Sequence, residues 1–61
     1  TKDACDFAVR GADALRLVGV AIQLDFSGIG VNQKGPYDKR FIHVDALPDE
    51  PGQPRPWLWS Y

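Results

Sequence analysis

The sequence predicts an α+β fold: a small antiparallel sheet carries one helix on one face, and an extended proline-rich tail follows. Three observations predict it. Residues 4–9 and 40–46 alternate with a period of two, residues 12–24 are amphipathic, and four prolines follow residue 47. A chain of 61 residues forms at most one domain, and one this short buries only about 60% of its unfolded surface. We therefore expect a partial domain that depends on a metal, a partner or further chain.

The first predicted strand covers residues 4–9. Cys5, Phe7 and Val9 lie on one face, and Asp6 lies on the other between two alanines. An ordinary solvent-facing strand would carry longer polar side chains, so these small neighbours leave room for something to approach Asp6. Because Cys5 is the only cysteine, an internal disulfide is excluded. We expect it to be a buried small hydrophobe, with an intermolecular bridge and a reactive thiol as the alternatives.

The predicted helix spans residues 12–24. Its apolar residues form two adjacent stripes at helical spacing, and Arg16 and Gln23 mark the polar side. Asp13 in the first turn suits the positive end of the helix dipole. Gly19 costs about 1 kcal/mol relative to alanine, and we expect it to permit close packing on the sheet. So broad an apolar arc predicts a helix covered on most sides, by the sheet and by chain outside this sequence.

The second half of the predicted domain contains a short strand at 29–32, a loop at 33–38 and the clearest strand at 40–46. In this last strand His43 and Asp45 lie on one face, and the aliphatic residues between them lie on the other. We expect the aliphatic face to cover the helix. The two polar side chains then face away from it.

Residues 1–47 form the predicted domain, and residues 48–61 form the tail. The prolines of the tail exclude regular structure, so we expect it to run extended over the surface. Three of its last five residues are aromatic, and aromatic side chains at a terminus rarely remain in water. Trp57 or Trp59 is therefore expected to anchor the tail to the domain.

Charge and hydropathy argue against nucleic acid or a membrane as the main partner. Seven basic and eight acidic residues give a formal net charge of −1. This balance argues against nucleic acid or an anionic membrane surface, because both select basic faces. No apolar run approaches the roughly 18 residues of a membrane span, and no signal-peptide pattern opens the chain. We expect neither nucleic-acid binding nor a membrane span.

Asp6 and His43 are the candidate metal ligands. If their strands are neighbours in one sheet with the helix behind, Asp6, His43 and Asp45 converge on the open face. Zinc takes imidazole nitrogen and carboxylate oxygen, and a catalytic site keeps three protein ligands and a water. The residues alone leave a second interpretation open, since a lone histidine in a strand is more often packed or half-exposed than a ligand.

Three segments carry a family resemblance: ACD at 4–6, GIGV at 28–31 and FIHVD at 41–45, with a tryptophan soon after. In this order and spacing they resemble the D-alanyl-D-alanine carboxypeptidase-like zinc peptidases, which have the hedgehog-type fold. The family pattern is similar to H-x-x-G-x-A-x-D, a helix, G-x-G, then F-V-H-x-D and a tryptophan. The resemblance spans nearly all of the chain and corresponds to the C-terminal half of the family domain.

The resemblance implies that Asp6 is the carboxylate ligand and His43 the second histidine ligand of a zinc ion. It places the first histidine ligand seven residues before Asp6, ahead of this chain, so we expect a longer parent polypeptide. Asp45 becomes the candidate catalytic base or an orienting carboxylate. Arg40 stands where many members have an acidic base, and Lys2 stands where the family usually has glycine.

The activity implied is that of a zinc-dependent metallopeptidase, a carboxypeptidase or endopeptidase that hydrolyses peptidoglycan stem peptides. Such a hydrolase belongs to the bacterial cell wall, envelope or periplasm, or to phage lysis and virion proteins such as an endolysin. Arg40 can pair with a substrate carboxylate, and Tyr37 can line the cleft. Two alternatives stay open: a catalytically degenerate module that binds peptide or serves in a phage particle, and an unrelated small interaction domain. Arg40 and Lys2 favour the degenerate module.

Overall fold

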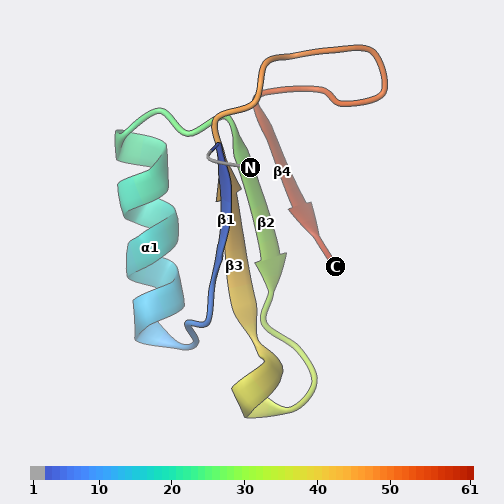
Figure 1. The fold of residues 1–61 in the computed structure, drawn as a ribbon. Coiled ribbons are helices and arrows are strands. Elements are labelled where there is room, and N and C mark those ends of the chain that lie inside the picture. Colours follow the sequence, from blue (N-terminus) through green and yellow to red (C-terminus); the bar gives the residue numbers. More distant parts are fainter. Residues whose placement is uncertain (1–2) are drawn as a thin grey trace.

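The computed structural model describes residues 3–61, so Lys2 lies outside the described residues. One helix lies against one face of a four-stranded sheet, which confirms the predicted α+β fold (Figure 1). Among the described residues, no helix has the length and apolar character needed to cross a membrane. The elements in chain order are β1 (Ala4–Phe7), α1 (Ala12–Gln23), β2 (Gly28–Asn32), the short 3₁₀ helix η1 (Tyr37–Lys39), β3 (Phe41–Asp45) and β4 (Trp57–Ser60).

The strand order is β1-β3-β2-β4. Strand β3 pairs antiparallel with both β1 and β2, whereas β4 pairs parallel with β2. The sheet is therefore mixed and not purely antiparallel. The four tail prolines all precede Trp57, so they leave the backbone donors of β4 intact, and Trp57 N donates to Ser27 O at 2.8 Å. The tail is irregular only up to Pro56; its end completes the sheet.

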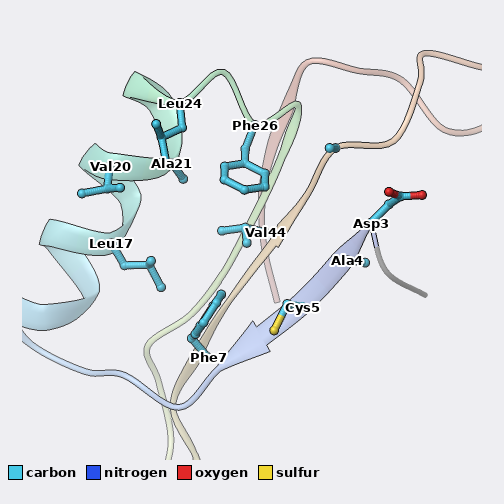
Figure 2. Close-up of a pocket in the computed structure, with 11 residues that line it drawn as sticks. Asp3, Ala4, Cys5, Phe7, Leu17, Val20, Ala21, Leu24, Phe26 and Val44 are labelled. Atoms are coloured by element: carbon cyan, nitrogen blue, oxygen red, sulfur yellow. The ribbon is translucent and has the colours of Figure 1, made fainter.

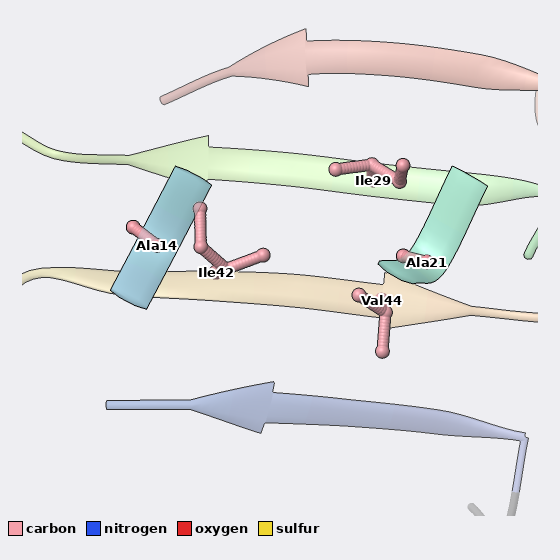
Figure 3. Close-up of a cluster of buried hydrophobic side chains, with 5 residues drawn as sticks. All are labelled: Ala14, Ala21, Ile29, Ile42 and Val44. Carbon is pink, nitrogen blue, oxygen red and sulfur yellow. The ribbon is translucent and has the colours of Figure 1, made fainter. Parts of the chain in front are cut away.

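The core lies between α1 and the two central strands (Figure 3). Ala14 and Ala21 of the helix pack on three aliphatic residues of the sheet, Ile29, Ile42 and Val44. Because α1 is covered on this side only, several large apolar side chains of the predicted arc remain exposed, Leu15 to 75%. Within the described residues only the sheet covers the helix, and the further cover expected from chain outside this sequence stays a prediction. Gly19, however, is not a close-packing position, since a Cβ there would meet nothing within 4 Å.

Strand β1 is an edge strand beside the helix. The helix lies over β2 and β3, and a groove of about 370 Å³ separates it from β1 (Figure 2). Cys5 is exposed and Phe7 is only partly covered at this groove. The expected burial of Cys5 is therefore wrong, because α1 packs over the central strands and does not reach across the sheet edge.

Candidate metal site

Four residues form one row across the sheet, on the face opposite the helix. Asp6 on β1 pairs with His43 on β3, His43 with Gly30 on β2, and Gly30 with Trp59 on β4. Cross-strand partners point to the same face, and the neighbours of His43 in β3 are the core residues that contact the helix. The sheet therefore presents Asp6, His43 and Trp59 side by side on its open face.

His43 lies between two carboxylates. Its Nδ1 is 2.8 Å from Asp6 Oδ1, and its Nε2 is 2.8 Å from Asp45 Oδ2. The side chains become progressively less accessible along this line: Asp6 is 63% exposed, His43 18% and Asp45 0%. The Trp59 ring covers one side of the imidazole, with the two ring centroids 5.3 Å apart.

Asp45 is held by a two-point ion pair with Arg55. Arg55 Nε donates to Asp45 Oδ1 at 2.9 Å, and Nη2 donates to Oδ2 at 2.8 Å. Leu47 N adds a third donor to Oδ1 at 3.3 Å. The hydrogen bonds from Arg55 hold the pKa of the Asp45 carboxyl well below its usual range, against the opposing effect of burial, with His43 and Leu47 also lowering it. Asp45 in turn raises the pKa of Arg55.

Two glycines of β2 make room for this arrangement. A Cβ on Gly28 would collide with the Asp45 carboxylate and lie 2.6 Å from Arg55 Nε. A Cβ on Gly30 would lie 2.6 Å from the Trp59 ring. Alternate glycines in a strand mark close approach of other groups, and here the G-x-G spacing clears two successive rows on the same face of the sheet.

The contact between His43 and Asp6 fits either a doubly protonated imidazole or a neutral imidazole whose free nitrogen binds a cation together with Asp6. A neutral imidazole has one N–H and one lone pair, whereas ionised carboxylates only accept hydrogen bonds. If Nε2 donates to Asp45, the Nδ1 lone pair faces Asp6 Oδ1 at 2.8 Å, and two acceptors meet. A second proton or a metal ion resolves this contact. Imidazole nitrogen and carboxylate oxygen are both zinc ligands, so the pair fits two positions of a zinc site.

A complete metal site needs more donors than these. Within residues 3–61 no group of three or more histidine, cysteine, aspartate or glutamate side chains is arranged to hold a metal ion. Asp45 does not serve as a third ligand here, because its oxygens already accept from Arg55, Leu47 and the far side of the imidazole. If the pair binds a metal ion, a further ligand of these types would come from outside the described residues.

The two predicted substrate-binding residues lie together but away from this row. Arg40 lines a hollow on the helix side of the sheet together with Ile42, whereas His43 faces the other side. The guanidinium groups of Arg40 and Arg10 lie 5.5 Å and 5.1 Å from the centroid of the exposed Tyr37 ring. The structure thus brings Asp6, His43 and Asp45 into one cluster and leaves Arg40 and Tyr37 in another.

Arg55 is the site residue that sequence inspection missed. It lies between two prolines in a segment expected to run over the surface, and a single arginine in such a segment has no periodic signal. Of the two tryptophans proposed as anchors, Trp59 is the one that packs, against His43 and Arg55, while Trp57 remains half exposed.

Comparisons with protein-family models, with curated proteins and with solved structures returned no match. The interpretation of the site therefore depends on its own geometry and on the motif order described above. The resemblance to zinc peptidases stays a prediction.

Acid should destabilise the fold through Asp45. An aspartate in an unfolded chain titrates near pH 3.9, whereas Arg55 holds the folded pKa of Asp45 well below that. As the pH falls, the unfolded state takes up this proton first, so the stabilising contribution of Asp45 is fully present above about pH 5 and is lost progressively below about pH 4. Thermal melting at a series of pH values measures this. An Asp45→Leu/Arg55→Met variant should lose part of the acid sensitivity; unchanged sensitivity would assign the transition to other carboxylates.

Proposed function

We propose that this chain belongs to a zinc-dependent hydrolase of peptidoglycan stem peptides and carries two of its zinc ligands, Asp6 and His43. The observation that supports this most directly is the 2.8 Å approach of Asp6 Oδ1 to His43 Nδ1, while the other ring nitrogen is occupied by Asp45. A proton or a metal ion shared by the two acceptors turns a repulsive contact into an attractive one, and the proposal takes the metal ion. The order of the ACD, GIGV and FIHVD segments supports the same assignment.

In this proposal the remaining ligand is a histidine from a segment outside the described residues. Zinc held by these residues would supply an activated water and a Lewis acid for the scissile carbonyl. Asp45 keeps the proton on Nε2 of His43, so that Nδ1 presents its lone pair to the open face. Because Asp45 is fully buried and its oxygens are all engaged, it suits this orienting role and not proton transfer to a substrate. The Asp6 side chain is 63% exposed, so this end of the cluster is open to solvent.

The proposed substrates are short peptides that contain D-amino acids, cleaved as a carboxypeptidase or as an endopeptidase. Such substrates place the protein at the bacterial cell envelope or among phage lysis and virion proteins. Arg40 and Tyr37 can contribute to substrate binding only beyond the sheet edge, because Arg40 lines the helix side.

A second candidate is a catalytically degenerate module of the same fold that binds cell-wall peptide. Two observations favour it. Within residues 3–61 no group of three or more donor side chains is arranged to hold a metal ion, and Arg40, at the place of the expected base, lies on the opposite side of the sheet. Both candidate proteins would bind a zinc ion or a peptide at the open face, but only the hydrolase would cleave the peptide.

The deciding experiment measures the zinc content of the full-length polypeptide and its action on purified muropeptides by mass spectrometry. One zinc per chain together with release of D-alanine or cleavage within the stem supports the hydrolase. Zinc without cleavage supports the degenerate module. Absence of zinc at saturating concentration, or a residue other than histidine seven positions before Asp6 in the parent sequence, would contradict the zinc assignment.

A further inference from the structure

We infer that Arg55 is a positioning residue for His43: acting through Asp45, it holds the imidazole with Nε2 protonated and Nδ1 turned toward Asp6. The structure carries this inference in a chain of three contacts. Arg55 binds Asp45 at two points, Asp45 Oδ2 lies 2.8 Å from His43 Nε2, and His43 Nδ1 lies 2.8 Å from Asp6. The inference deepens the proposed function, since the orientation of Nδ1 matters most when it binds zinc.

The first step is that the Asp45 carboxylate cannot rotate. Two parallel N–H donors from one planar guanidinium define the plane of the carboxylate as well as its distance, which a single hydrogen bond does not. Leu47 N occupies a further acceptor position on Oδ1. The one direction left for Oδ2 is toward His43 Nε2, so the imidazole meets an acceptor of fixed position.

The second step is that Arg55 is itself held in place. Its side chain is 10% exposed, its Nη1 donates to Pro54 O at 2.7 Å, and its backbone N donates to Asp49 Oδ1 at 2.8 Å. Its guanidinium lies 5.1 Å from the Trp59 ring centroid, and the same ring packs on His43. The tail therefore brings in both the residue that orients Asp45 and the ring that covers the imidazole.

The third step is that the planar fork is required, and not the charge alone. Lysine is a point charge on a flexible stem and cannot bind both carboxylate oxygens in this geometry. An Arg55→Lys variant keeps a cation near Asp45 but releases the plane of the carboxylate. We therefore expect this variant to retain the fold and to lose part of the control over the His43 tautomer.

The test uses the full-length polypeptide with Arg55→Met and Arg55→Lys, and with Arg16→Met as a matched control. Arg16 is 77% exposed and pairs only loosely with Asp13, at 3.4 Å. Zinc dissociation constants and the ¹⁵N chemical shifts of the His43 imidazole at pH 8 are measured. Arg55→Met should weaken zinc binding by about 10- to 100-fold and convert a single Nε2–H tautomer into a mixture. Arg55→Lys should be intermediate, and Arg16→Met should match wild type.

The Asp45→Leu/Arg55→Met double variant separates positioning from a purely structural role. Removing both partners leaves no buried charge unpaired, so the thermal stability lost in Arg55→Met should return, and the double variant stays folded if the single one does not. The zinc affinity and the single His43 tautomer should not return, because no carboxylate then accepts a hydrogen bond from His43 Nε2.

Two results would overturn the inference: wild-type tautomer in the Arg55→Met variant, or recovery of tautomer and stability together in the double variant. If wild type binds no zinc, the proposed function fails. The imidazole shifts of the zinc-free protein still decide whether Arg55 positions His43.

Discussion

Replacing His43 by alanine should remove zinc from the full-length polypeptide and abolish cleavage of stem peptides. Loss of a residue that only orients a ligand typically weakens metal binding by about 10- to 100-fold, so loss of a ligand should exceed about 100-fold. The Asp6→Asn variant should behave similarly, because the amide keeps the size of the side chain and loses its negative charge. Zinc titration followed by mass spectrometry of muropeptide digests measures both effects.

The matched control for Asp6→Asn is Asp13→Asn. Both carboxylates are well exposed, with side chains 63% and 74% accessible, but Asp13 lies on the helix and pairs with Arg16. The Asp13→Asn variant should bind zinc as tightly as wild type. If Asp6→Asn and Asp13→Asn bind zinc equally well, Asp6 is not a ligand, and its contact with His43 is a pair between a carboxylate and an imidazolium.

The Gly28→Ala variant should destabilise the fold by about 3 kcal/mol, since breaking a buried ion pair costs about 3–5 kcal/mol and overpacking about 1–3 kcal/mol. The added Cβ would occupy the space of the Asp45 carboxylate and of Arg55 Nε. These atoms cannot move aside at low cost, because Asp45 is fully buried and bound at several points. For a domain of this size the expected loss corresponds to a melting temperature lower by about 12 °C or more.

Gly19→Ala is the control with the opposite expected sign. Gly19 is inside α1, and a Cβ there meets nothing within 4 Å, so the substitution should stabilise the helix by about 0.5–1 kcal/mol. Thermal or urea unfolding of both variants makes the comparison. If the Gly28→Ala protein is as stable as wild type, the Asp45–Arg55 ion pair can be displaced freely. The positioning role given to this ion pair would then have to be abandoned.

The sequence predicted the helix and three of the four strands to within three residues at each end. Period-two alternation also placed His43 and Asp45 on the face away from the helix, and Asp6 on the corresponding face of its own strand. These features depend on local periodicity, which a single sequence displays directly.

Other features followed only from contacts between distant parts of the chain. The parallel pairing of β4, the exposure of Cys5 and the two-point contact of Arg55 with Asp45 involve no local pattern that could predict them. The resemblance drew attention to the glycines of β2. Only the tertiary structure shows why glycine is needed there: a side chain would collide with Asp45, Arg55 or Trp59.

By itself, then, the sequence determined which side chains share a face, because backbone geometry makes successive residues of a strand alternate between its two sides. The tertiary structure alone decided which of those side chains meet. That outcome depends on strand register and on the path of residues 46–56, which carries Arg55 and Trp59 back to His43. Register and return path are set by the burial of the whole sheet, and no short stretch of sequence encodes them.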